Sequence, residues 1–361
     1  MSVSCIGFIF SVFGNYKLSI TLKKKCKNLI TSFTYSANDK VLVIFLVVFF
    51  IFEVIYSGYV PIFSGDYASI LEASFGIPVV HGLYLAFLSY ISIVFFQKYL
   101  SCKIFRINNK YIMYIIIINL LFVFAGRRGT IVFNMLCYFM LYSIYYVSFG
   151  YSIKKFVVYV TTFIMLFFYG FNYIGNLRLG VSSNEYILGV GKATDTFKES
   201  IIPSEFFYGY LYVSTPIQIF DLNRTSLNMP LSDYLLSSIV PDFLSKRLGF
   251  VNEVEMINVG GFNVGGPFLL PYAYFGMAGI SILLMYFFIL NILVYLSIKR
   301  GNKRSLISLS VLWSIALLLS FDNLLNSSGY ILQLFYGLLF TSVLSVKYSG
   351  TSLLPTRKRY I

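Results

Sequence analysis

The chain has 361 residues, of which 58% are hydrophobic and only 12% are charged, and its mean hydropathy is +0.78. Because roughly a quarter of the residues in a soluble domain are charged, this composition excludes a water-soluble fold. The formal net charge of +14 comes from short basic connections between apolar segments, so it indicates contact with anionic lipid and not nucleic-acid binding.

Long apolar runs recur along the chain, and several approach the roughly 20 residues that a helix needs to cross a bilayer. Lipid offers no backbone partners, so these runs must be helical. We predict an all-α, polytopic membrane protein with about nine to ten transmembrane helices. The predicted spans cover residues 3–18, 41–60, 78–97, 111–125, 130–149, 156–175, 268–298, 305–321 and 329–346. Residues 206–220 are interpreted as re-entrant or interfacial, since one more crossing there would spoil the alternation of sides.

The charges between these spans are sorted by side. One set of connections holds 20 Lys and Arg residues but a single acid, Asp39, whereas the opposite set holds 8 Lys and Arg residues and 12 acids. The positive-inside rule makes the first set cytoplasmic. The basic set comprises residues 17–40, 98–110, 150–155, 299–304 and the tail from 347, and the outer set comprises 61–77, 126–129, 176–265 and 322–328.

One outer connection is far longer than the others and divides the chain into three parts. Residues 1–175 form N-terminal transmembrane helices, and residues 266–361 form C-terminal transmembrane helices with a basic cytoplasmic tail. The segment 176–265 between them is longer than a simple connection requires, so we expect it to contain the functional site. Within it, residues 203–222 and 230–248 have the pattern of amphipathic helices on the outer face.

Arginines stand on the outer side against the charge rule. Arg127 and Arg128 occupy AGRRGT, a short turn between two spans, and Arg178 lies in GNLRLG just after another span. A guanidinium binds phosphate with two hydrogen bonds and stays charged when half buried, so these residues are candidates to hold a lipid-linked diphosphate. Lys246 and Arg247 complete the cationic pocket if their segment folds back. The alternative is that these cations reach ordinary phospholipid head groups or solvent.

Ionisable groups near the outer ends of the spans are the remaining candidates. Glu53 lies inside a predicted span, where a charge is costly, and its expected partner is an outer arginine such as Arg127, although a structural ion pair explains it equally. His81, the only histidine, is expected to be an interfacial hydrogen-bonding residue, and one histidine cannot form a zinc site. No metal or cofactor is predicted. The carboxylates that qualify as general base are Glu205, Asp221, Asp233, Asp242 and Asp322.

The layout resembles the bacterial O-antigen polymerases, or oligosaccharide repeat-unit polymerases. The resemblance covers most of the chain and rests on the single large outer loop and on the order of four motifs. These motifs are AGRRGT at 125–130, NLRLG at 176–180, GYLYVSTPIQIFDLN at 209–223 and PYAYFGMAGI at 271–280. A short or missing first span departs from the larger number of spans usual in the family.

The resemblance implies a GT-C-like glycosyltransferase of the bacterial inner membrane that needs no cofactor. It would move a growing glycan from undecaprenyl diphosphate to the non-reducing end of a new lipid-linked repeat unit at the periplasmic face. By motif match, Arg127, Arg128 and Arg178 would engage the diphosphates, and Tyr210 would be a substrate-binding residue. Lys246, Arg247 and Glu53 join the substrate-binding set by position alone. Implied partners are the undecaprenyl-diphosphate-linked oligosaccharide, membrane lipids, a chain-length regulator and a flippase.

Other functions compete with this interpretation. A flippase for lipid-linked sugars usually shows repeated halves, and no internal repeat is visible. An O-antigen ligase shares the chemistry and differs only in its acceptor, but the absence of histidine from the large loop favours a polymerase. A scaffold or chain-length regulator usually has few spans and a long coiled coil, which this sequence lacks.

Overall fold

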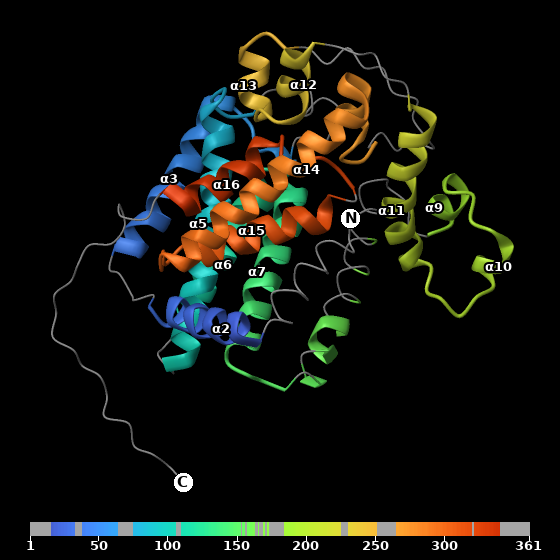
Figure 1. The fold of residues 1–361 in the computed structure, drawn as a ribbon. Helices are drawn as coiled ribbons and strands as arrows, with labels where there is room; N and C mark the ends of the chain where they lie inside the picture. Colours follow the sequence, from blue (N-terminus) through green and yellow to red (C-terminus); the bar gives the residue numbers. More distant parts are fainter. Residues whose placement is uncertain are drawn as a thin grey trace.

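The computed structural model describes residues 16–32, 38–63, 75–105, 110–152, 184–224, 230–250, 265–319 and 321–339, together with some positions between 154 and 172. In these residues every regular element is a helix (Figure 1). The predicted span 3–18 and most of 156–175 lie outside this part of the chain.

The elements follow the order that the apolar runs predict. The N-terminal part holds α2 (Tyr16–Thr31), α3 (Asn38–Ser57), the 3-10 turn η1 (Pro61–Phe63), α5 (Val80–Phe105), α6 (Tyr111–Phe124) and α7 (Arg128–Ser148). The outer segment holds α9 (Glu185–Val190), α10 (Asp195–Lys198), α11 (Glu205–Leu222), α12 (Leu231–Ser238) and α13 (Asp242–Arg247). The C-terminal part holds α14 (Leu269–Lys299), α15 (Ser305–Leu318) and α16 (Ser328–Leu339).

Four of the described helices are long and apolar enough to cross a membrane: 38–57, 80–105, 129–148 and 269–299. The helices α6, α15 and α16 are also apolar but shorter. Each predicted span from 41–60 to 130–149, and from 268–298 to 329–346, overlaps one of these seven helices, of which α5 extends furthest beyond its predicted span. The predicted helical fold class is therefore confirmed for the described residues, while the total of nine to ten crossings stays a prediction.

Helix α5 is the centre of the bundle and packs against α6, α7 and α16. Its buried faces carry small polar residues as well as apolar ones, and two of these make hydrogen bonds to α7. Ser89 donates to the Asn134 side chain, and the Ser92 hydroxyl bonds to the Tyr138 hydroxyl. Buried hydroxyls need such partners, so these bonds fix the rotation of α7 against α5.

Helix α3 lies at the edge of the bundle, and its exposed face is entirely apolar over residues 41–55. Three polar contacts join its buried face to α5 along its length. Lys98 donates to both carboxylate oxygens of Asp39 at 2.6 Å, Tyr84 donates to the Leu46 carbonyl at 2.8 Å, and His81 pairs with Glu53. An apolar outer face held by a polar seam is expected for a helix that faces lipid.

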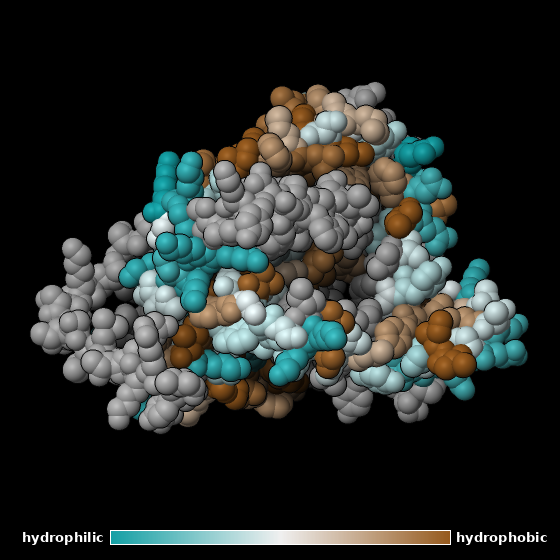
Figure 2. Space-filling view, turned by 60° about the horizontal axis from the view of Figure 1, so that its bottom comes forward, coloured by the Kyte–Doolittle hydropathy of each residue, from teal (hydrophilic) through white to brown (hydrophobic). Residues whose placement is uncertain are grey.

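The described parts of the two predicted sets of connections lie at opposite ends of the bundle, except that α9, α10 and α11 of the outer segment lie beside it (Figure 1). At one end, which we call the basic end, Lys25 Nζ donates to the Lys299 carbonyl at 2.6 Å and Lys27 lies over the Phe149 ring. Figure 2 brings this end forward and shows hydrophilic side chains grouped beside hydrophobic ones. The other end, which we call the cavity end, contains α12, α13 and the loop before α16.

The helix α2 is a correction to the sequence analysis, which assigned residues 17–40 to a connection. It lies across the basic end, at the bottom of Figure 1. Leu29 and Ile30 are buried against the bundle, whereas Lys23, Lys24 and Lys27 are exposed. This amphipathic pattern is typical of a helix at a membrane surface, and its lysines conceal it from a search for apolar runs.

Helices α12 and α13 form a hairpin that is docked on the cavity end. Residues 230–248 were expected to form one amphipathic stretch, but the helix stops before Pro241, which begins α13 as its N-cap. The Tyr234 hydroxyl donates to the Gly279 carbonyl of α14 at 2.8 Å, and burial raises the pKa of Tyr234 to about 12, so the phenol keeps its proton. Asn326 Nδ2 donates to the Ser237 carbonyl at 2.7 Å.

Helix α14 is kinked where the motif PYAYFGMAGI lies. Phe275 and Gly276 have non-helical backbone angles, and Gly276 has a φ of 56° that favours glycine. A Cβ atom at Gly279 would lie 2.1 Å from the Pro271 carbonyl oxygen, so this position also requires glycine. The motif therefore encodes a bend at the docking site of α12.

A cysteine-labelling experiment tests the predicted orientation. In a cysteine-free background, Thr196→Cys between α9 and α11 should react with an impermeant maleimide in intact cells. Asn28→Cys on α2 should react only after permeabilisation. Both positions are exposed, so burial does not decide the outcome, and the charge sorting places them on opposite sides. Labelling of Asn28→Cys but not Thr196→Cys in intact cells would reverse the orientation.

Candidate anion-binding site

A cavity of about 710 Å³ opens at the cavity end, which is within the size range of ligand pockets. Four segments that are distant in sequence surround it. They are η1 with residues 75–83, the turn at 125–127, helix α13, and the start of α16 at Ser328 and Leu332. All of them belong to the predicted outer connections or to the adjoining helix ends.

Arg127 reaches the cavity from the turn between α6 and α7. Gly126 has a φ of 66°, and the Arg127 N–H donates to the Phe122 carbonyl at 2.9 Å, which closes α6 with a Schellman motif. Arg127 is also the residue that precedes α7. An anion beside its exposed guanidinium would therefore also be near the positive end of the α7 dipole.

Lys246 and Arg247 line the same cavity from the last turn of α13. Basic residues are favourable at this end of a helix because they offset its dipole. Both side chains are exposed, and among the described residues neither they nor Arg127 have a carboxylate within 4 Å. The cavity thus has three cations whose charge is not neutralised by a described ion pair.

Asp242 lies at the start of α13 and ties it to α16. Its Oδ1 atom accepts hydrogen bonds from the backbone N–H of Phe243 and of Ser328, both at 2.9 Å, and from the Ser328 hydroxyl. Its own N–H donates to the Asn326 carbonyl at 2.9 Å. These bonds set the position of α13, and therefore of Lys246 and Arg247, against the bundle.

Glu53 and His81 form a buried pair behind the cavity wall. Glu53 is 0% exposed and His81 is 8% exposed, and His81 Nδ1 lies 3.1 and 3.0 Å from the two carboxylate oxygens. The expected partner of Glu53 was an outer arginine, so this is a correction. Glu53 and His81 occupy the outer ends of neighbouring antiparallel helices and lie at the same depth, whereas Arg127 is exposed at the rim.

The backbone that covers this pair has unusual geometry. Gly76 has a φ of 80° and packs directly on the pair, and its N–H donates to the Ser57 hydroxyl at 2.7 Å. The Phe75 ring meets the His81 ring edge-on, with 5.3 Å between centroids. Val79 has a φ of 70°, which is unfavourable for a β-branched residue and is typically found at functional sites.

Replacement of Gly76 by Ala should damage this region more than its backbone conformation explains. A Cβ atom there would lie 2.7 Å from His81 Nδ1 and 2.8 Å from Glu53 Oε1. Gly58 is a matched control, because its φ is 77° but nothing lies within 4 Å of its Cβ. Both variants should lose about 1–2 kcal/mol from the left-handed backbone, and Gly76→Ala about 1–3 kcal/mol more from overpacking. Thermal unfolding in detergent measures the difference, and equal losses would contradict the contact.

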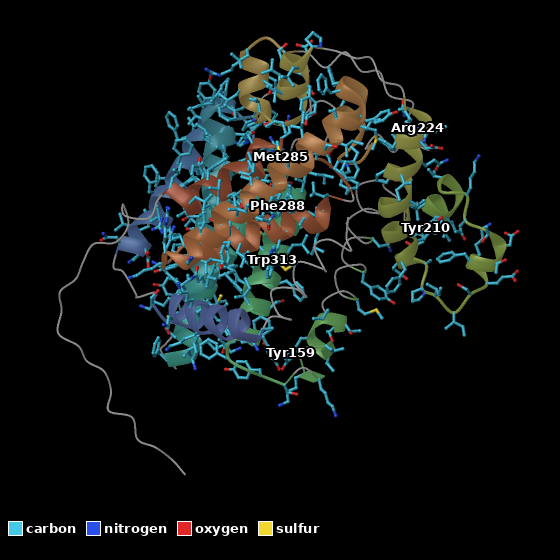
Figure 3. All side chains as sticks on the ribbon, viewed as in Figure 1. Tyr159, Tyr210, Arg224, Met285, Phe288 and Trp313 are labelled. Carbon is cyan, nitrogen blue, oxygen red and sulfur yellow. The ribbon has the colours of Figure 1, made fainter. Side chains whose placement is uncertain are left out.

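The other predicted residues do not line this cavity. Tyr210, which is 62% exposed, lies on α11 with Asp221 at a second cavity of about 670 Å³, and Figure 3 shows Tyr210 well away from α13. Glu205 begins α11, Asp233 lies on α12, and Asp322 lies in the loop before α16. Arg178 and the side chain of Arg128 lie outside the described residues. Of the predicted set, the structure therefore brings together Arg127, Asp242, Lys246 and Arg247, with Glu53 behind them.

The pairing of His81 with Glu53 was not predicted from the sequence. A signal for it was present, because each residue is an isolated ionisable group near the outer end of its predicted span, and consecutive spans are neighbours. Within the described part of the chain, no group of three or more His, Cys, Asp or Glu side chains is placed to hold a metal ion.

No protein-family model, curated protein or solved structure matches this chain. The function is therefore argued from the chemistry of the site.

Proposed function

We propose that the chain is a glycosyltransferase that polymerises undecaprenyl-diphosphate-linked oligosaccharide repeat units into O-antigen or capsular polysaccharide. The reaction would take place at the periplasmic face of the bacterial inner membrane. The observation that carries the proposal is the cavity where Arg127, Lys246 and Arg247 converge. It lies at the end of the bundle that the charge sorting assigns to the outside.

The chemistry of the cavity suits a diphosphate leaving group. In the proposed reaction an acceptor hydroxyl attacks the anomeric carbon of the donor glycan, and the bond from that carbon to the diphosphate oxygen breaks. Negative charge then grows on the diphosphate, and fixed cations stabilise charge that develops in a transition state. The energy of the new glycosidic bond comes from the donor diphosphate, so the reaction needs no nucleotide or redox cofactor.

The surroundings of the cavity suit a substrate with a long isoprenoid chain. Helix α3 exposes an apolar face that includes Ile51, Phe52 and Ile55 near its outer end, and the exposed Leu83 lines the cavity itself. A lipid-linked substrate entering sideways from the bilayer would keep its chain against such a face while its head group reaches the cations. The corresponding partners would be membrane lipids, a flippase that supplies the repeat unit, and a chain-length regulator.

Surface polysaccharide in a deletion strain tests the proposal. If the chain is a polymerase, deletion should reduce the ladder seen on a gel to a single repeat unit on lipid, and complementation should restore it. Loss of all surface sugar would instead identify a flippase or an O-antigen ligase. Accumulation of finished polymer on the undecaprenyl carrier would distinguish the ligase from the flippase.

A further inference from the structure

The pair formed by Glu53 and His81 is connected to the cavity through one side chain only. His81 lines the cavity, whereas Glu53 is completely buried and touches His81 Nδ1 with both carboxylate oxygens. The second ring nitrogen, Nε2, has no hydrogen-bond partner among the residues that the structure describes. The imidazole is thus held from behind and has one nitrogen left for a ligand.

We propose that His81 is the catalytic base of this site and that Glu53 is the residue that positions it. This inference rests on the proposed function, because it names the group that takes the proton from the acceptor hydroxyl. His81 Nε2 would accept that proton as the hydroxyl oxygen bonds to the anomeric carbon. The diphosphate would leave with the electron pair of the broken bond, beside Arg127, Lys246 and Arg247.

The geometry selects the required tautomer. A buried carboxylate accepts a hydrogen bond from Nδ1–H, so the proton of the neutral ring is kept on Nδ1 and Nε2 carries the lone pair. After proton transfer the ring is a cation, and Glu53 stabilises it without taking the proton itself. Acyl-transfer enzymes use the same two roles, in which a carboxylate orients an imidazole and the imidazole takes the proton. These roles depend on geometry and not on sequence position.

A purely structural role explains less of what surrounds the pair. Helix α3 is already joined to α5 by the Lys98–Asp39 ion pair and by the Tyr84 hydrogen bond, and neither contact lines the cavity. The pair at the cavity is also enclosed by the strained backbone at Val79 and the close approach of Gly76. Local strain of this kind is maintained where the surrounding structure fixes a functional geometry.

Asp242 is the carboxylate that lines this cavity, so it is the alternative candidate for the base. It is less suited to this role than His81. Its Oδ1 atom accepts three hydrogen bonds, two of them from Ser328. The other charged groups that line the cavity with His81 are Arg127, Lys246 and Arg247, and all three are cations. A cation has no lone pair with which to accept a proton, so none of these three residues can act as the base.

The test uses the full-length protein in detergent, with lipid-linked repeat units extracted from the deletion strain as substrate and undecaprenyl diphosphate as the binding probe. His81→Ala should lower the rate of polymer formation by about 100-fold or more, as expected for loss of a general base. Binding of undecaprenyl diphosphate should change by less than about twofold. Added imidazole should restore part of the activity of His81→Ala. The imidazole molecule can enter from the open cavity and occupy the space that the histidine ring leaves.

Glu53→Gln is the sharper variant, because it keeps the size of the side chain and can still hydrogen-bond to the ring. Its amide donates to Nδ1 and moves the ring proton to Nε2, so activity should fall about 100-fold or more while the melting temperature is retained. Glu53→Asp should recover more activity than Glu53→Gln. The pH profile of the rate should differ between the wild type and His81→Ala, because only the wild type has a base at this position.

Each result has a defined meaning. Wild-type rates and an unchanged pH profile in His81→Ala, or full activity in Glu53→Gln, would overturn the inference. If the wild-type protein binds undecaprenyl diphosphate and polymerises the repeat units but the histidine variants do the same, only the base assignment fails. If the wild-type protein does neither, the proposed function itself fails.

Discussion

Replacement of Arg127 by Ala should abolish the polysaccharide ladder while leaving the amount of protein in the membrane unchanged. Arg127 is exposed at the cavity, beside the start of α7, and no described carboxylate lies within 4 Å of it. Removal of one group that stabilises developing charge typically costs about 100- to 1000-fold in rate. Because the side chain is exposed, little folding free energy is lost with it.

The pattern of partial rescue identifies what Arg127 does. Arg127→Lys should restore little activity, because an ammonium is a point charge and cannot make the paired hydrogen bonds of a guanidinium to phosphate. Arg224→Ala is a matched control, because Arg224 is an exposed arginine of the outer segment that does not line the cavity. It lies at the end of α11, apart from α13 (Figure 3), and 3.9 Å from Asp221. A normal ladder in Arg127→Ala, or equal loss in Arg224→Ala, would remove Arg127 from the site.

The positions of the long helices were predictable because the bilayer imposes a simple rule on the sequence. A segment without backbone partners in lipid must be an apolar helix, so runs such as 41–60 and 268–298 indicate α3 and α14. Charge sorting also assigned Pro61, Arg127 and Ser328 to one side, and the structure brings these three residues together around one cavity. The helix α2 escaped this reasoning because it lies across the basic end and its five lysines, between Lys17 and Lys27, interrupt every apolar window.

The cations of the site were predictable for the same reason that makes them unusual. Arg127, Lys246 and Arg247 lie on the side that the charge rule keeps poor in positive charge, so each was a candidate before its position was known. The sequence could not show that the hairpin of α12 and α13 folds back onto the bundle. That docking depends on Asn323 and Asn326, which donate to the Ser238 and Ser237 carbonyls across sequence separations of 85 and 89 residues.

The predicted partner of Glu53 was wrong because the position of a residue in a span indicates its depth in the membrane but not the direction in which its side chain points. Glu53 lies near the outer end of α3, and both His81 and Arg127 were expected near that level. A helix rotation of about 100° per residue decides which of them a side chain faces. In the structure Glu53 points inward to His81, while Arg127 stays at the exposed turn.

Replacement of Asp242 should also have a large effect on the site, because its carboxylate holds the helix that carries two of the three cations, Lys246 and Arg247. Asp242→Ala removes the acceptor for both Ser328 bonds and for the Phe243 N–H, and hydrogen bonds to a charged group are worth about 1.5–3 kcal/mol each. We expect α13 to detach from the start of α16. Undecaprenyl diphosphate binding should then fall about tenfold or more, and cleavage by an added protease between residues 230 and 250 should become faster.

Asp242→Asn separates this positioning role from proton transfer. The amide oxygen can still accept from the Ser328 and Phe243 N–H groups, so α13 should stay docked and most of the polymer ladder should remain. An amide cannot act as a base, so a general-base role for Asp242 requires Asp242→Asn to be as inactive as Asp242→Ala. Retained activity in Asp242→Asn, together with its loss in Asp242→Ala, would show that the carboxylate acts through the placement of Lys246 and Arg247. The ladder, the binding of undecaprenyl diphosphate and the rate of proteolysis, measured on both variants, decide between these two roles.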